Sequence, residues 1–288
     1  MRPTLVTKSR RVQAVQVQSV VASQLPQETP PAATDFLGVP VHPVRYDQAW
    51  DLIRCWAEQR VGRNVCFAAV AVVIHAHDLP DFRLALTTAD LVLPDGMPAV
   101  WWMRRSGHPD QQRLCGPDLI FKLCGDAASG KIPVGFLGST PETLRLICQN
   151  FRERWPDLDI RYAYGPPLGP LTEAEDSSIL DEINKSGTRL LFVGLGCPKQ
   201  EQWMVRVRSR SQVIMIGIGA AFDVAAGTRR VPPLWVQRMG LQWAYRLGQE
   251  PRRLWRRYHR ENTRFFCMLV RHWLSRSTSQ SIRRNARR

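Results

Sequence analysis

Short apolar runs alternate with helical patterns over most of the chain, and this alternation restricts the fold more than any other sequence feature. Six apolar runs predict β-strands, at residues 65–68, 90–93, 132–137, 158–162, 189–194 and 213–217. Helical patterns surround them, at about residues 48–60, 70–86, 117–128, 141–155, 173–186 and 199–209. Strands and helices that alternate at this spacing predict an α/β fold with a mostly parallel sheet flanked by helices.

Ligands of such sheets bind beyond the carboxyl ends of the strands, so the turns that leave the strands are the candidate sites. The run at 90–93 leads into Pro-Asp-Gly, which puts the carboxylate of Asp95 on a tight turn. Two other strands end in glycine pairs, at Gly194 with Gly196 and at Gly217 with Gly219. Neither pair has the third glycine of a dinucleotide-binding fingerprint, so the sequence does not favour a nicotinamide cofactor. Pro-Asp-Gly is also an ordinary turn sequence, and by itself it leaves the role of Asp95 open.

Positive charge is concentrated at the C-terminal end of the chain. Residues 35–228 have a net charge of −2, whereas residues 229–288 hold 16 arginines, no lysine and two acids, a net of +14. A basic tail on a nearly neutral body indicates a polyanionic partner, either lipid headgroups or nucleic acid.

The tail from residue 252 onward is amphipathic when it is drawn as a helix at about 100° per residue. Seven arginines share one sector: 252, 253, 256, 257, 260, 264 and 271. Large apolar residues share the opposite sector: Leu254, Trp255, Tyr258, Phe265, Phe266, Leu269 and Trp273. This pattern is typical of a helix that lies in a membrane interface. A helix packed on the body and a nucleic-acid-binding arm are the two other interpretations of the same pattern.

These features divide the chain into four parts. We expect a disordered extension over residues 1–34, an α/β domain over 35–228, a helical appendage over 229–275 and a basic, disordered tail over 276–288. No apolar run reaches the roughly 18 to 20 residues of a membrane-spanning helix, and we see no secretory signal. The seven cysteines lack a C-x-x-C pair, which predicts reduced thiols and no structural zinc site.

Five sequence blocks, in order, resemble the WecG/TagA/CpsF glycosyltransferases (glycosyltransferase family 26). They are Thr-Ala-Asp-Leu-Val-Leu-Pro-Asp-Gly-Met at 88–97, Arg-Leu-Cys-Gly-Pro-Asp-Leu at 113–119, Val-Gly-Leu-Gly-Cys-Pro-Lys-Gln-Glu at 193–201, Gly-Ile-Gly-Ala-Ala-Phe-Asp at 217–223, and the appendage segment 237–253. The resemblance covers about residues 37–270.

The resemblance implies a Rossmann-like domain that transfers a sugar, such as a hexose or N-acetylhexosamine, from a UDP-sugar to a polyprenyl-diphosphate-linked saccharide in surface or extracellular polysaccharide synthesis. It implies inversion at the anomeric carbon, no metal and no cofactor, and an enzyme in the cytoplasm, peripheral at the inner face of the membrane. It further implies that Asp95 is the general base and that Arg113 acts on the donor or its leaving group. The implied substrate-binding residues are Gly194, Gly196, Lys199, Gln200, Asp223, Arg246, Arg253 and Arg256.

These residue types suit that chemistry. An inverting displacement needs one carboxylate that takes the proton of the attacking hydroxyl. Arginine can stabilise a departing diphosphate without a metal, because it is permanently charged and makes bidentate contacts to phosphate.

One segment departs from the family pattern. Phe67 and Ala69 stand where the resemblance predicts a threonine and an asparagine beside the base, which leaves the sugar substrates open. Two other functions are compatible with the sequence: a non-catalytic nucleic-acid-binding protein with an arginine-rich arm, and an enzyme of the same fold with a soluble acceptor. The neutral body and the apolar residues opposite the arginines favour the membrane enzyme, so we expect no nucleic-acid partner.

Overall fold

The structure, a computed structural model, describes residues 29–167 and 169–285, without the side chains of residues 234, 253 and 275–285. The domain core is a six-stranded, all-parallel sheet in the order β4-β3-β8-β7-β5-β6. Its strands are β3 (Arg63–Ala68), β4 (Leu91–Pro94), β5 (Val134–Gly138), β6 (Ile160–Tyr164), β7 (Leu190–Gly194) and β8 (Ile214–Gly217). All six predicted strands are therefore present, with ends shifted by at most two residues, and the Rossmann-like α/β fold is confirmed.

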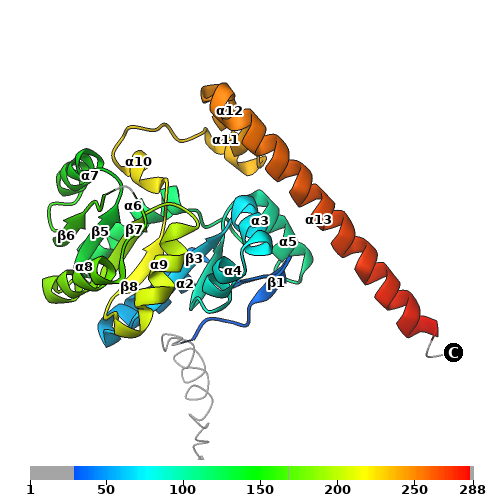
Figure 1. The fold of residues 1–288 in the computed structure, drawn as a ribbon, viewed down its shortest axis with the longest axis horizontal. Coiled ribbons are helices and arrows are strands. Elements are labelled where there is room, and N and C mark those ends of the chain that lie inside the picture. Colours follow the sequence, from blue (N-terminus) through cyan, green and yellow to red (C-terminus); the bar gives the residue numbers. More distant parts are fainter. Residues whose placement is uncertain (1–28, 168, 286–288) are drawn as a thin grey trace, which may run out of the picture.

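Helices cover both faces of the sheet (Figure 1). One face packs against α2 (Tyr46–Gln59), α6 (Gly116–Ser129), α7 (Pro141–Arg154) and α10 (Ala221–Ala225). The other packs against α3 (Val70–Asp78), α4 (Pro80–Thr87), α5 (Met97–Arg105), α8 (Glu173–Ser186) and α9 (Lys199–Val207), which runs into the 3-10 turn η1 (Arg208–Arg210). Leu190 and Phe192 of β7 face the first layer, and Leu191 and Val193 face the second. A strand buried on both faces must be apolar throughout, as this one is.

Local breaks change some of the predicted elements. The helix predicted over 70–86 is two helices, because Pro80 lacks the N–H that would continue the hydrogen-bonding pattern of α3 and instead begins α4. The helix α5 was not predicted. Neither was the hairpin of β1 (Thr34–Phe36) and β2 (Val39–Val41), whose turn residues Leu37 and Gly38 both have positive φ. Thr34, the last residue of the expected extension, thus belongs to the body, while residues 1–28 lie outside the described part.

The appendage consists of α11 (Leu234–Arg238), α12 (Gln242–Gln249) and the long α13 (Pro251–Asn285). Within the expected helical appendage, Gly240, with a φ of +72°, separates α11 from α12. The tail expected to be disordered from 276 onward is part of α13 as far as Asn285. No proline or glycine follows Pro251, so the sequence gives no signal that would end the helix earlier.

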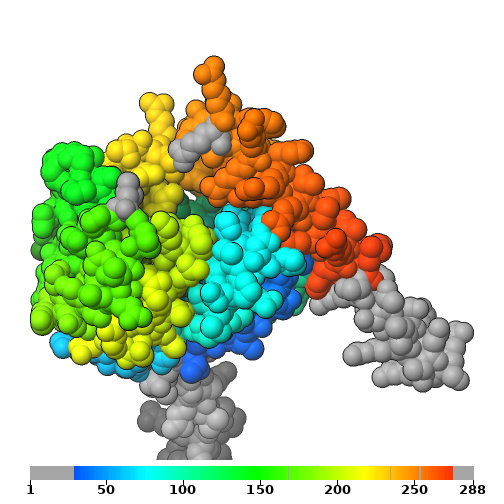
Figure 2. Space-filling model, viewed as in Figure 1, coloured from blue at the N-terminus to red at the C-terminus, as the bar shows by residue number. Residues whose placement is uncertain are grey.

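The helix α13 runs along the outside of the domain, beside α3 (Figures 1 and 2). Leu254 and Phe265 are buried, and the ring of Phe265 lies 6.0 Å from that of Phe36 in β1. Arg264 makes an ion pair with Asp78 at the end of α3, with one contact of 2.6 Å. The helix is therefore packed on the body, as one of the three interpretations of the sequence predicted.

A second row of apolar side chains on α13 is largely exposed. Trp255, Phe266 and Trp273 are 52%, 66% and 69% exposed. Their spacings of 11 and 7 residues align them along one side of a helix at about 100° per residue. We call these three residues the aromatic stripe. The predicted apolar face is thus divided, with one part packed on the domain and the other open to its surroundings.

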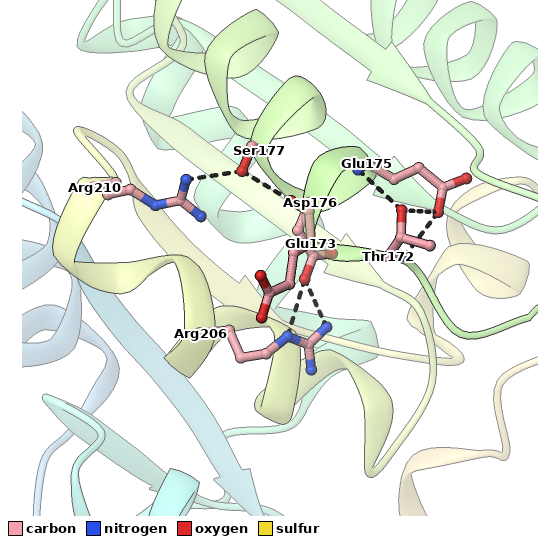
Figure 3. Close-up of polar contacts among 7 residues, drawn as sticks. All are labelled: Thr172, Glu173, Glu175, Asp176, Ser177, Arg206 and Arg210. Atoms are coloured by element: carbon pink, nitrogen blue, oxygen red, sulfur yellow. Dashed lines mark hydrogen bonds and ion pairs between the residues drawn. The ribbon is translucent and has the colours of Figure 1, made fainter.

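Charged contacts fix α9, which begins at the proposed site, against α8 (Figure 3). The carboxylate of Asp176, in the first turn of α8, is buried and accepts a hydrogen bond of 2.9 Å from Nε of Arg206. Arg210 donates to the hydroxyl of Ser177, at 2.9 Å. A buried carboxylate without a partner would be costly, so Asp176 holds the end of α9 in place through Arg206.

Candidate active site

The turn after β4 holds Asp95 at the carboxyl end of the sheet. The backbone N–H of Asp95 donates to the carbonyl of Ala68, at the end of the neighbouring strand β3, at 3.3 Å. Gly96 has a φ of +85°, a left-handed value that favours glycine, and α5 begins one residue later. The half-buried side chain of Asp95 therefore lies at the strand edge where this fold binds ligands.

Arg113 reaches the same edge from the loop before α6. The N–H of Leu114 donates to the carbonyl of Pro94 at 3.0 Å, which ties this loop to the end of β4. The side chain of Arg113 is only 12% exposed, and its Nη2 donates to the carboxylate of Asp118 at 2.7 Å. Its Nη1 is buried and has no hydrogen-bond partner among the described residues. A buried, unpaired donor is costly, and a ligand oxygen can satisfy it.

The electrostatic surroundings of Asp95 bring a third residue into the site. Burial raises the pKa of Asp95 to about 6, and the positive charges of Arg113 and Arg246 act in the opposite direction. Arg246 belongs to α12 of the appendage. The positive charges of one arginine from the domain and one from the appendage therefore act on the carboxylate, and a pKa near 6 suits a general base at neutral pH.

Close backbone packing forms the neighbouring part of the edge, after β7 and β8. Gly196 has a φ of +83°. A Cβ at Gly194 would lie 2.5 Å from the ring of Phe222, so only glycine fits there. Gly116, at the start of α6, packs closely on Ile218, because a Cβ there would lie 3.2 Å from the Ile218 carbonyl oxygen. This contact joins the loop that carries Arg113 to the turn after β8.

Gln200 lies beneath these turns at the start of α9. Its side chain is buried, and its Nε2 donates to Oε1 of Glu201 at 2.8 Å. A Cβ at Gly217 or Gly219 would lie 3.1 Å or 3.4 Å from the Gln200 amide. The Oε1 of Gln200 has no hydrogen-bond partner within the described part of the chain. Gln200 therefore offers a free acceptor beside the turn after β8.

The other expected site residues lie in different surroundings. Lys199 is exposed at the start of α9. Asp223 of α10 forms an ion pair with Nη1 of Arg229 at 3.2 Å. The other terminal nitrogen of Arg229, Nη2, lies 3.8 Å from Glu250. With these residues, Thr228, Arg230 and Gln249 line an open polar pocket of about 380 Å³.

The two other appendage arginines named from the sequence are Arg253 and Arg256. Arg256 is exposed, and its guanidinium lies 5.6 Å from the ring centre of Trp255 on the same helix. The side chain of Arg253 lies outside the described residues. The charge of the third, Arg246, acts on Asp95.

Three residues of the site had no predicted role: Asp118, Glu201 and Gln237. Asp118 and Gln237 both accept a hydrogen bond from Nη2 of Arg113. All three lie within the quoted sequence blocks, and the positions of Asp118 and Glu201 close to Arg113 and Gln200 along the chain were a usable signal. Gln237 follows Arg113 by 124 residues, and no local pattern connects the two.

The two positions that depart from the family pattern have different surroundings. Phe67 is buried in the core and pairs with Leu93 across the sheet. Ala69 directly follows Ala68, whose carbonyl accepts the hydrogen bond from the N–H of Asp95. The side chain of Ala69 packs against the core layer that includes α3. Neither side chain can donate or accept a hydrogen bond at the base.

Within residues 29–167 and 169–285, no three His, Cys, Asp or Glu side chains are grouped closely enough to hold a metal ion. None of the described helices combines the length and the apolar character that crossing a bilayer requires.

The Glycosyl transferase WecG/TagA/CpsF family model matches residues 34–279, and the chain belongs to this family. It is 30% identical over 203 residues to the N-acetylglucosaminyldiphosphoundecaprenol N-acetyl-beta-D-mannosaminyltransferase of Bacillus spizizenii. That alignment covers 70% of this chain and 77% of the relative.

Proposed function

We propose that this glycosyltransferase moves a sugar from a UDP-sugar to a polyprenyl-diphosphate-linked saccharide, with inversion and without a metal. The observation that carries the proposal is the half-buried Asp95 at the strand edge, where the positive charges of Arg113 and Arg246 act on its carboxylate. The name of the Bacillus spizizenii relative supports an N-acetylhexosamine as the transferred sugar and a lipid diphosphate saccharide as the acceptor.

Each residue of the cluster has a step in this reaction. Asp95, deprotonated at neutral pH, takes the proton of the acceptor hydroxyl as its oxygen attacks C1 of the donor sugar. The C1–O bond to the diphosphate breaks on the opposite side, and UDP leaves. Arg113 and Arg246 stabilise the negative charge that develops on the leaving diphosphate. The free Nη1 of Arg113 is available for such an oxygen.

The turns after β7 and β8 bind the rest of the donor in this proposal. Gly194 and Gly196 allow the close approach of a ligand to the backbone, and Gln200 offers its free carbonyl oxygen. Asp223, Lys199 and the appendage arginines, Arg253 and Arg256 included, complete the substrate-binding set that the family resemblance implies.

We further propose that the enzyme works in the cytoplasm at the inner face of the membrane. A polyprenyl acceptor remains in the bilayer, so the site must reach the bilayer surface. The aromatic stripe and the arginines of α13 provide apolar and cationic groups on one helix, which supports attachment to an anionic lipid surface rather than to nucleic acid.

Replacement of the base tests the reaction. Asp95→Asn should lower kcat by at least about a hundredfold, because the amide cannot accept the proton. The assay measures UDP release from UDP-N-acetylmannosamine with N-acetylglucosaminyl-diphospho-undecaprenol, and a panel of other UDP-sugars tests the donor. For the unmodified enzyme, kcat/KM should fall below about pH 6, where Asp95 becomes protonated. A folded Asp95→Asn variant with near-normal turnover would exclude Asp95 as the base.

A further inference from the structure

Gln237 links the appendage to the arginine of the proposed active site. It lies in α11, and its side chain is only 4% exposed. Its carbonyl oxygen accepts a hydrogen bond from Nη2 of Arg113, and its Nε2 donates to the carbonyl of Pro232 at 2.6 Å. The amide nitrogen is thus turned toward Pro232, which leaves the amide oxygen toward Arg113. Only this oxygen can accept a hydrogen bond from a guanidinium.

Two acceptors therefore hold one nitrogen of Arg113. Asp118 contacts Nη2 from the domain and Gln237 contacts it from the appendage, while Nη1 is left buried and unpaired among the described residues. The arginine side chain is long and flexible. Hydrogen bonds to Nη2 hold the guanidinium in place and so keep Nη1 in one position. The unpaired donor is the atom that a ligand oxygen would satisfy.

Gln237 is uncharged, and it therefore leaves the positive charge of Arg113 intact. A second carboxylate at this position would hold Arg113 equally well, but it would cancel the positive charge that a diphosphate leaving group needs. An amide accepts the hydrogen bond without adding negative charge. Asp118, the charged partner, is 44% exposed, so water weakens its field at Arg113.

The end of α11 is itself seated on the domain next to Asp95. Gly240 packs on α5, because a Cβ there would lie 3.1 Å from the ring of Trp101 and 3.2 Å from Cβ of Met97. Met97 begins α5 two residues after Asp95. The contact of Gln237 with Arg113 therefore depends on the docking of α11 beside the proposed base.

We infer that Gln237 is a positioning residue that orients Arg113 toward the diphosphate of the nucleotide-sugar donor, so that the arginine is aligned only when α11 is docked. This inference rests on the proposed function, in which Arg113 stabilises the leaving group. Gln237 acts through Arg113 and has no contact with the reacting atoms in this scheme.

A double-mutant cycle tests the inference. Gln237→Met keeps the buried volume but removes the acceptor, and it should lower kcat by about tenfold to a hundredfold, the range of one hydrogen bond to a charged group. The KM for the lipid acceptor should change little. Arg113→Ala should lower kcat by about a hundredfold or more. In the Arg113→Ala background, Gln237→Met should have almost no further effect, because the group it orients is gone.

The controls separate the possible failures. Gln149→Ala changes an exposed glutamine on α7, whose side chain bonds to Arg145 and Glu153 on that helix, and it should leave kcat unchanged. Multiplicative losses in the double variant would overturn the inference, because a merely structural role of Gln237 does not depend on Arg113. An Arg113→Ala variant with normal turnover would instead overturn the role of Arg113 in the proposed function. Circular dichroism of each variant confirms folding.

Discussion

At the residue scale, Glu201 is a buried carboxyl group that lowers the stability of the folded protein and also holds the side chain of Gln200 in the site. Its side chain is 3% exposed, and burial raises its pKa to about 7, although the hydrogen bond from Gln200 acts in the opposite direction. Its second oxygen has no hydrogen-bond partner in the described part of the chain. Glu201 holds the amide of Gln200 through this bond, and the folded protein bears the cost whenever Glu201 is ionised.

This cost predicts a pH-dependent effect of Glu201→Gln on stability. A carboxyl group with a raised folded-state pKa binds its proton more tightly in the folded chain, so the group destabilises the fold as the pH rises from 4.5 to about 7. Glutamine keeps the acceptor for Gln200 without the charge. The free energy of unfolding at pH 8 should therefore rise by on the order of 2 kcal/mol in the variant, with little change at pH 4.5.

Urea denaturation at the two pH values measures this effect. Glu153→Gln, at an exposed position on α7, is the matched control and should show no such difference. Equal effects of Glu201→Gln at both pH values would contradict the burial argument.

At the scale of elements, α13 has three sides with different surroundings. Leu254 and Phe265 contact the domain, the aromatic stripe is exposed, and the arginines occupy the remaining side. The sequence correctly predicted that apolar and charged residues lie on opposite sides of this helix. A helical wheel, however, distinguishes only these two kinds of face. It could not show that the β1–β2 hairpin would cover one part of the apolar face.

Replacement of Phe265 should release α13 without unfolding the domain. Phe265→Ala removes a buried ring next to Phe36, and such a truncation costs about 3–5 kcal/mol at a fully enclosed site. Because α13 lies on the outside of the domain (Figure 1), the loss should appear as faster hydrogen exchange in α13, while the sheet keeps its protection. Phe266→Ala, at the next residue, which is 66% exposed, should leave the exchange unchanged. Equal effects of the two variants would show that α13 does not dock through Phe265.

At the scale of the whole molecule, charge and exposed aromatic residues are found together on the appendage. The chain has a net charge of +15, nearly all of it in the last 60 residues. The aromatic stripe lies on the same helix as most of these arginines. A surface that is both cationic and apolar matches a lipid interface, which offers anionic headgroups above an apolar layer.

Removal of the aromatic stripe should weaken binding to vesicles. The triple variant Trp255→Ser, Phe266→Ser, Trp273→Ser should lower partitioning onto vesicles of phosphatidylglycerol and phosphatidylcholine by at least about tenfold, since each buried aromatic side chain contributes about 1.5–3 kcal/mol. Co-sedimentation measures the bound fraction. Leu84→Ser with Tyr164→Ser, at exposed apolar positions of the domain, is the control. Retention on RNA together with no binding of the unmodified protein to vesicles would favour the nucleic-acid interpretation instead.

The sequence by itself determined the six strands and the main helices of the domain, because apolar periodicity and turn residues act over short stretches of chain. It also put Asp95 on the turn after β4 and Gln200 after β7. It gave no sign of α5, of the short β1–β2 hairpin or of the break at Gly240, where packing against other elements decides the structure.

Only the tertiary structure decided which groups surround the carboxylate. Arg113 meets Gln237 across 124 residues of chain, and Arg246 acts on Asp95 from a different helix of the appendage. Such contacts depend on how folded elements dock, and no local periodicity encodes the docking of α11 and α12 beside β4. The identity of the strands is therefore a property of short segments, whereas the charge and orientation at the site are properties of the assembled chain.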